Sequence, residues 1–293
     1  MCAVSEREPE PRRASHLPEV EGVPPAQYLG AERVLETIGH HGALRVEGFG
    51  VGQLLVLSGL AGGLITAGAI FSLLLGAAVE TPGPQRLLEG LGFSTGFFFV
   101  VLVSAILFTE ANVTMPSVVL ACRSPARSIA RFWALAWIGN LLGAIAIGGL
   151  MVLAQDFPDD VTGLLDEVIT AKLSFREQGG LGGWLELVVS GMLANWLVGM
   201  AAFFATMGRT IIGKYIPVFL AVTLFVAANF QHSPANMGYF SLAEWMGDGP
   251  GWDVALWWNI IPAGIGNVIG GTLFVALPLW YGLRLRAARE SSA

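Results

Sequence analysis

The sequence has few charged residues, two cysteines and four histidines. Only 13% of its 293 residues are charged, while 54% are hydrophobic. Such a chain is too apolar for a soluble globular domain, and its composition is typical of a polytopic membrane protein. Cys2 and Cys122 have no metal-binding or redox spacing, and no His–Cys cluster forms a metal site. The composition therefore predicts a membrane protein without disulfides, metal or other cofactors.

Apolar stretches long enough to cross a bilayer, at about 20 residues per span, occur six times in the chain. They cover residues 50–79, 91–108, 130–154, 184–206, 215–231 and 254–283. The second and fifth are followed by polar, turn-like segments and short apolar stubs, so we expect these two spans to be interrupted. This pattern divides the chain into an N-terminal tail (1–49), a membrane domain (50–283) and a C-terminal tail (284–293).

The N-terminal tail is polar and rich in proline, and it lacks the pattern of a signal peptide. We expect residues 1–28 to be disordered and residues 30–45 to form a short amphipathic helix on the membrane surface, placed to act as a cytoplasmic lid. His40 and His41 lie in this helix. They are expected to be solvated side chains, because no other ligand has a suitable spacing for a metal.

The positive charges predict the orientation of the chain. All lysines and arginines except Arg86, Lys172 and Arg176 lie in the tails or in the loops on one side of the expected membrane. The positive-inside rule then places this side and both termini in the cytoplasm. We therefore expect a multi-pass protein of the cytoplasmic membrane, with membrane lipid around it and no nucleic-acid partner.

The two halves of the membrane domain resemble each other. Residues 58–69 of the first span parallel residues 190–201 of the fourth, and Ile-Gly-Asn-Leu-Leu-Gly at 138–143 parallels Ile-Gly-Asn-Val-Ile-Gly at 265–270. Three spans per half is an odd number, so the second half must insert upside down. The sequence therefore predicts an all-α fold of two inverted three-span repeats, as found in channels and transporters.

The two interrupted spans carry the candidate functional groups. The first break is predicted at residues 107–116 and the second at residues 230–237. Non-helical backbone at membrane depth must be buried in protein or line a cavity, so we expect the two loops to meet near the midplane. Thr109 offers a hydroxyl from one loop and His232 an imidazole from the other. An ionisable group at this depth is a functional candidate; the alternative is a histidine that caps loose backbone groups.

Phenylalanines precede both breaks and predict a narrow, apolar pore with a polar ring at its waist. Phe93, Phe97 and Phe98 lead into the first break, and Phe225 and Phe230 lead into the second. For Phe97 and Phe98, the alternative is that they face lipid or neighbouring helices.

Four segments together give the chain a resemblance to a known family. They are Leu-Phe-Thr-Glu at 107–110, Ala-Asn-Trp-Leu-Val at 194–198, Phe-Gln-His-Ser-Pro-Ala-Asn-Met at 230–237, and the glycine-rich stretch 259–271. In this order they resemble the formate/nitrite transporters over most of residues 50–283. The resemblance implies an aquaporin-like fold, a homopentamer and one pore per protomer.

The resemblance also implies roles for single residues. His232 matches the central histidine and Thr109 its partner, while Asn195 and Asn267 match asparagines that line the central region. The residues expected to narrow the pore are Phe93, Phe225, Leu107 and Phe97.

The sequence departs from the family pattern at one position and matches it less closely at another. Gln231 stands where the family has a glutamate before the central histidine, which predicts a less basic histidine. Lys172 matches a lysine of the outer vestibule, although residues 176–183 resemble a small insertion that leaves an exposed loop lysine as the alternative.

These features predict transport of a small monovalent weak acid, such as formate or nitrite, together with a proton. Lys172 or Arg176 would gather the anion, and His232 would donate a proton or a hydrogen bond to it. The alternative is an aquaporin-like channel for water or small neutral solutes, but Met-Pro-Ser at 115–117 and Ser-Pro-Ala at 233–235 replace the two Asn-Pro-Ala signatures. An enzyme is not expected, because only Glu110 and His232 could form a catalytic pair. The sequence does not choose among formate, nitrite, hydrosulfide, lactate and acetate.

Overall fold

The computed structural model describes residues 28–121 and 124–290, with side chains described as far as residue 283. Both cysteines lie outside these ranges, and so do residues 1–27 of the segment 1–28 that was predicted to be disordered; Tyr28 is described. The described chain contains helices and no strand beyond one isolated bridge between Tyr28 and Gly208, so the all-helical prediction holds for it. Its elements are α1 (Ala31–Gly48), α2 (Val51–Gly76), α3 (Pro82–Leu102), α4 (Phe108–Leu120), α5 (Ala126–Ala154), α6 (Asp159–Gln178), α7 (Gly180–Met207), α8 (Ile211–Ala227), α9 (Ser233–Met246), α10 (Trp252–Ala255), η1 (Leu256–Ile260), α11 (Ile261–Gly270), η2 (Gly271–Ala276) and α12 (Leu277–Glu290).

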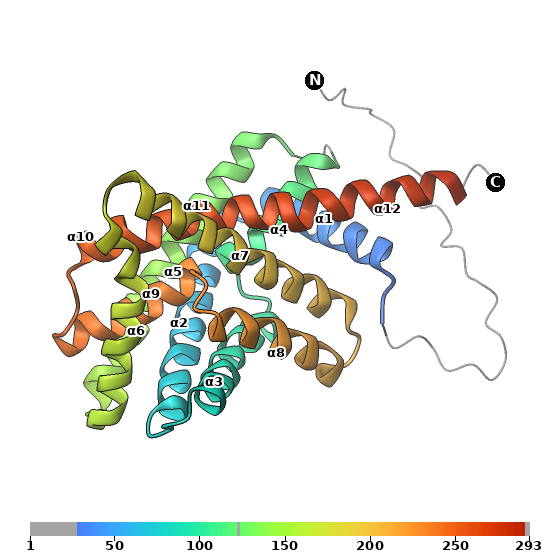
Figure 1. The fold of residues 1–293 in the computed structure, drawn as a ribbon. Helices are drawn as coiled ribbons and strands as arrows, with labels where there is room; N and C mark the ends of the chain where they lie inside the picture. The colour runs from blue at the N-terminus through green and yellow to red at the C-terminus, as the bar shows by residue number, and fades with distance from the viewer. Residues whose placement is uncertain (1–27, 122–123, 291–293) are drawn as a thin grey trace.

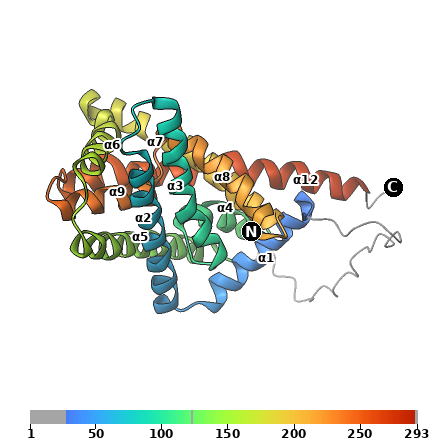
Figure 2. The same cartoon turned by 90° about the horizontal axis from the view of Figure 1, so that it is seen from below.

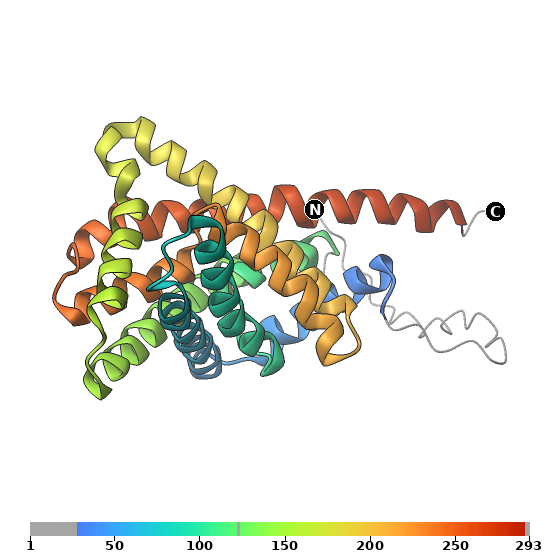
Figure 3. The ribbon, with the colours of Figure 1, turned by 60° about the horizontal axis from the view of Figure 1, so that its bottom comes forward.

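Within the described residues, four helical segments are long and apolar enough to cross a membrane. They are α2, α5, α7 and the continuous rod that runs from α10 through residue 283. These four match the first, third, fourth and sixth predicted spans. Helix α8 is apolar but shorter, with 17 residues. The rod ends in α12, which projects beyond the bundle in Figures 1 and 3.

Both interruptions lie slightly earlier in the chain than the sequence predicts. The chain leaves helical geometry after Leu102 and re-enters it at Phe108, and it does so again between Ala227 and Ser233. Thus most of the predicted breaks at 107–116 and 230–237 belongs to the half-helices α4 and α9. The reason for the second difference is that Pro234 stands in the first turn of α9, where its missing N–H costs nothing.

Small residues let the long helices approach closely. Gly143 of α5 packs against Gly59 of α2, so an added methyl group would overlap the carbonyl oxygen of Gly59. In the second half, Gly270 of α11 packs against Met192 of α7 in the same way. Such contacts between backbones are how helices associate tightly in a bilayer. Figure 2 shows α2 crossing α5, the pair of helices that Gly59 and Gly143 bring together.

Helix α6 was not predicted from the sequence, which suggested only an outer loop at this point. It contacts α7 and α9 and runs along one side of the bundle in Figure 1. Its buried residues are Val161, Leu164, Leu165, Ile169 and Lys172, a spacing that places them on one face of the helix. Residues 176–183, read from the sequence as an insertion, form the end of α6 and the start of α7.

The N-terminal helix α1 packs on the inner half-helix α4 and also contacts α7 and α12. Arg45 Nη1 of α1 lies 3.7 Å from Glu110 Oε1 of α4, one residue after Thr109. Both histidines of α1, His40 and His41, are exposed. At the other end of the chain, the predicted tail from residue 284 continues α12 as helix to Glu290.

Candidate functional site

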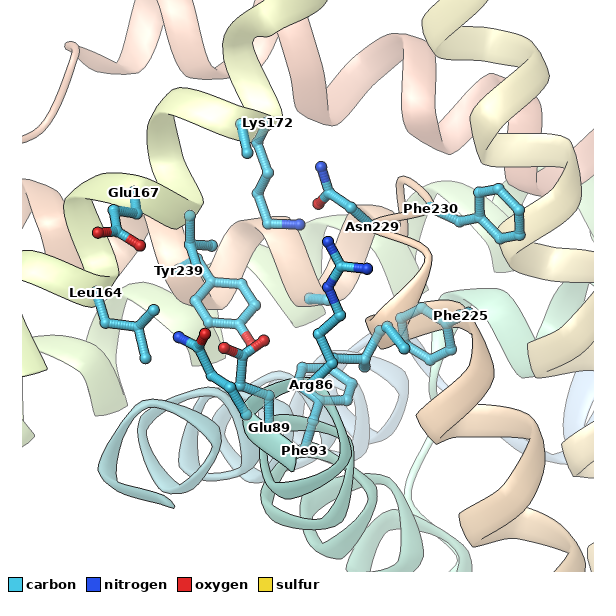
Figure 4. Close-up of a pocket in the computed structure, with 16 residues that line it drawn as sticks. Arg86, Glu89, Phe93, Leu164, Glu167, Lys172, Phe225, Asn229, Phe230 and Tyr239 are labelled. Carbon is cyan, nitrogen blue, oxygen red and sulfur yellow. The ribbon is translucent and has the colours of Figure 1, made fainter. Parts of the chain in front are cut away.

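A cavity of about 280 Å³ opens between α3, α6, α8 and α9. Charged and polar side chains face it from its outer part, where Figure 4 shows Arg86, Glu89, Glu167, Lys172 and Asn229 around one space. Its inner part is aromatic. The cavity therefore leads from a charged mouth to an apolar floor.

Lys172 is the most enclosed cation of this cavity. Only 5% of its surface is exposed, and its Nζ lies 5.2 Å from the centre of the Tyr239 ring. Burial lowers the pKa of Lys172 to about 7, an effect that the neighbouring Glu89 carboxylate opposes. Helix α6 is not among the membrane-spanning segments, and it places this side chain inward, so Lys172 is not an exposed loop lysine.

Phe93 and Phe225 close the inner end of the cavity. Their ring centroids are 5.6 Å apart in an edge-to-face arrangement, and both side chains are almost completely buried. The His232 ring lies directly behind them, 5.2 Å from the Phe225 ring and 6.4 Å from the Phe93 ring. His232 does not line the cavity itself, and the two phenylalanine rings lie between it and the cavity.

His232 and Thr109 meet at the point where the two half-helices begin. Thr109 Oγ1 lies 2.8 Å from His232 Nε2, and both residues are fully buried. His232 is also the N-cap of α9, where its Nδ1 accepts a hydrogen bond from the backbone N–H of Ala235 at 3.1 Å. Since Nδ1 is an acceptor, a neutral ring carries its proton on Nε2 and donates to Thr109. The capping function considered from the sequence is therefore present together with the contact to Thr109.

Two asparagines hold the half-helices in the same manner. Asn140 Oδ1 accepts from the backbone N–H of Phe108, the first residue of α4, and its Nδ2 donates to the carbonyls of Ser58 and Ile106. These bonds satisfy the backbone groups that a broken helix leaves without partners.

Asn267 does the same for α9. Its Oδ1 accepts from the N–H of Ser233, the first residue of that half-helix, and its Nδ2 donates to the carbonyls of Gly191 and Gln231. The two asparagines stand at the same place in the repeated Ile-Gly-Asn motif, so the repeat in the sequence corresponds to a repeated hydrogen-bond pattern.

Gln231 belongs to a network of neutral amides behind His232. Its Oε1 accepts from Asn236 Nδ2 and Asn259 Nδ2, while its Nε2 donates to the carbonyl of Asn229. Asn259 also donates to the carbonyl of Lys172 at 2.9 Å. The network ties the turn before His232 to the helix that carries Lys172. The network contains no charge, because Gln231 stands where the family pattern has a glutamate.

Comparison with known proteins identifies the family. Residues 32–281 match the family model described as formate/nitrite transporter. The chain belongs to the formate/nitrite transporter family. A protein of Methanothermobacter thermautotrophicus named "Probable formate transporter" is 30% identical over 251 residues, which cover 79% of this chain and 89% of that protein. The nitrite transporter NirC of Escherichia coli is 27% identical, and the match covers 77% of this chain and 82% of NirC.

Solved structures share the fold of this chain. An FNT family ion channel superposes with a TM-score of 0.74 at 24% identity, covering 85% of this chain and 98% of that one. A structure titled as a pentameric formate channel with formate bound superposes with a TM-score of 0.66, also at 24% identity, covering 80% of this chain and 97% of that one.

The other residues expected in the family's pore are all buried, but they do not all meet His232. Asn195 Nδ2 donates to the backbone carbonyl of Asn267 at 2.7 Å, so it supports the residue that holds α9. Phe97 and Leu107 lie in the hydrophobic core and do not line the cavity. For Phe97, this agrees with the packing alternative.

Several residues of the site were not found from the sequence. Arg86 and Tyr239 line the cavity, and Asn236 and Asn259 build the amide network. Asn140 could have been found, because it shares the repeated motif with Asn267. Among the residues that the structure describes, no group of three potential metal ligands comes together.

Proposed function

We propose that this protein carries a small monovalent weak acid, such as formate or nitrite, across the cytoplasmic membrane through one narrow pore in each protomer of a homopentamer. The observation that carries the proposal is the buried contact between His232 and Thr109, which lies behind the Phe93–Phe225 pair at the floor of a cavity that contains Lys172. Family membership supports anion transport, and the relatives' names give formate and nitrite as the first substrates to test.

The charged mouth gathers the anion. Lys172 and Arg86 supply positive charge inside a cavity whose other ionisable groups, Glu89 and Glu167, keep the net charge low. A free anion cannot enter the aromatic floor cheaply, because removing a charge from water costs several kcal/mol or more. The acid therefore takes up a proton near Lys172 and passes the phenylalanines as a neutral molecule.

His232 then acts as a hydrogen-bond donor at the waist of the pore. Its Nδ1 is engaged by the Ala235 N–H, and a proton placed there would set two N–H groups against each other. Nε2–H and the Thr109 hydroxyl are the groups that remain to meet the acid. The N-termini of α4 and α9, which both begin here, add the positive ends of two helix dipoles.

The membrane arrangement belongs to the same proposal. We place both termini in the cytoplasm, on the basis of the positive charges, and the cavity with Lys172 on the outer side. The three-span halves are inverted relative to each other, which the matching hydrogen bonds of Asn140 and Asn267 support.

Uptake of isotope-labelled formate into proteoliposomes tests the proposal. We expect the wild-type protein to catalyse uptake, and His232→Ala to lose roughly tenfold or more of it, because the buried donor is gone. His41→Ala, a histidine exposed on α1, is the matched control and should transport normally. Undiminished uptake by His232→Ala, with the same pH dependence, would exclude the role of the imidazole. Osmotic swelling without anion uptake would instead identify a channel for water or neutral solutes.

A further inference from the structure

The buried side-chain amide of Asn112 forms no hydrogen bond with any described residue. It lies on α4 three residues after Thr109 and is completely inaccessible, yet neither its Oδ1 nor its Nδ2 has a hydrogen-bond partner among the described residues. Buried side-chain amides nearly always have partners, because leaving one without them costs about 1–3 kcal/mol. Residues three apart on a helix share a face, so Asn112 continues the surface that Thr109 begins.

A second asparagine contributes to the same place from α7. Asn195 is also completely buried, and its Oδ1 has no partner among the described residues, although its Nδ2 is bonded to Asn267. A β-carbon at Gly271 would lie 2.6 Å from Asn195 Nδ2 and 3.0 Å from Asn112 Cβ. The two asparagines therefore flank one glycine, where η2 comes close to α4.

The backbone adds one more acceptor. Pro116 stands inside α4, four residues after Asn112, and proline has no N–H to offer the Asn112 carbonyl. The local groups without helix partners are thus three acceptors, namely Asn112 O, Asn112 Oδ1 and Asn195 Oδ1, and three N–H donors, two on Asn112 Nδ2 and one on Asn195 Nδ2. An anion has only acceptors to offer, so it would leave all three of these acceptors without a donor. An undissociated carboxylic or nitrous acid carries an O–H donor beside an oxygen acceptor, which matches an amide.

We infer that Asn112 and Asn195 form an inner binding site that takes the undissociated acid after it has passed His232 and Thr109. No residue of α4 lines the outer cavity, and α4 leads away from it toward α1, so this site lies on the opposite side of the waist. The site keeps the acid neutral until it leaves the constriction. This inference rests on the proposed function. It adds that the inner half of the pore selects the undissociated form of the substrate.

Formate uptake by variants of this site provides the first test. Asn112→Leu keeps the side-chain volume and removes both hydrogen-bonding atoms. We expect it to raise the formate concentration for half-maximal uptake roughly tenfold. Gly271→Ala reaches the site from another element and should act in the same direction, since its methyl group crowds Asn195. Ser117→Ala is the control, because this buried hydroxyl of α4 bonds only to the carbonyl of its own helix at Val113.

Infrared difference spectra with isotope-labelled formate provide the second test. The wild-type protein should show a labelled carbonyl band of the undissociated acid, and Asn112→Leu should lose it while keeping the assembly and melting temperature of the wild type. Normal uptake and an unchanged band in Asn112→Leu would overturn the inner site alone. A labelled carboxylate band only, or no labelled band, would overturn it in favour of an anion or water at this position. Absence of formate uptake by the wild type would overturn the proposed function as well.

Discussion

The Lys172 side chain is almost completely buried, and its charge changes with pH near neutrality. The charged groups around it are Arg86 and Glu89 on α3 and Glu167 on its own helix, while α9 contributes only the Tyr239 ring and α8 no charged side chain. With its pKa lowered to about 7 by burial, Lys172 is mostly charged below this pH and mostly neutral above it. In the proposed function, the cavity therefore attracts anions more strongly below this pH than above it.

This charge should appear in the pH dependence of transport. As the outer pH rises from about 6 to about 8, we expect the formate concentration for half-maximal uptake to rise several-fold more in the wild type than in Lys172→Arg, because arginine stays charged throughout. In Lys172→Gln, which carries no charge at this position, the formate concentration for half-maximal uptake should be high at both pH values. Uptake into proteoliposomes measures this, and the acid's own titration is common to all three proteins. A Lys172→Gln profile identical to that of the wild type would contradict the prediction.

At single residues, the sequence predicted some contacts and missed others for physical reasons. The pairing of Thr109 with His232 could be predicted, because the repeat relates the two interrupted spans and their loops were expected to meet. The burial of Lys172 was harder to see, since a lysine among acidic residues is normally solvated, although the apolar spacing of α6 includes its position. Phe97 could not be placed, because the direction of one side chain depends on how its helix is rotated.

The helices are positioned by contacts between backbones as much as by side chains. Gly143 and Gly270 stand at equivalent places in the two halves, each against a carbonyl of the neighbouring span. The site depends on these contacts, because α5 and α11 also carry Asn140 and Asn267, the anchors of the half-helices. A shift of either helix would therefore move a half-helix as well.

Gly143→Ala should destabilise the protein. A methyl group there meets backbone rather than a flexible side chain, so relief requires the helices to separate, and overpacking of this kind costs about 1–3 kcal/mol or more. Gly52→Ala is the control, because nothing lies within 4 Å of the added methyl group on α2, and alanine favours a helix. Thermal unfolding in detergent should give a lower midpoint for the first variant and an equal or higher one for the second. Equal midpoints for both variants would contradict tight packing.

At this scale, four of the six predicted spans correspond to described helices that are long and apolar enough to cross a membrane, and the interruptions lie slightly earlier than predicted. Long apolar runs signal a span directly, whereas the end of a helix depends on a few hydrogen bonds. Both predicted breaks contain a proline, but Pro234 begins a half-helix and Pro116 stands within one. Helix α6 was missed because it has no long apolar run; its stability comes from one apolar face against α7 and α9.

The whole molecule presents large apolar surfaces to its surroundings. Helix α5 is the least buried of the long apolar helices, and Leu142, Leu150 and Leu153 on it are all more than half exposed. Helix α8 presents Ile216, Leu220 and Leu224 in the same way. In a bilayer such surfaces face lipid or neighbouring protomers. Their extent on several sides is compatible with a ring of subunits that is itself surrounded by lipid.

Native mass spectrometry from detergent should therefore detect an assembly of five times the 31.0 kDa chain, about 155 kDa. Cross-linking in native membranes provides a control against dissociation by the detergent. A single 31.0 kDa species under both conditions would show that the protein works as a monomer.

The paired anchors Asn140 and Asn267 have a consequence for the dimensions of the waist. Thr109 and His232 are brought to 2.8 Å of each other by two half-helices, each fixed at its first residue by one amide side chain. The separation of these two groups therefore depends on the positions of both half-helices, and each position is set by its own anchor. We therefore expect substitutions at either asparagine to change this separation, and with it the selectivity of the proposed pore, without altering Thr109 or His232 themselves.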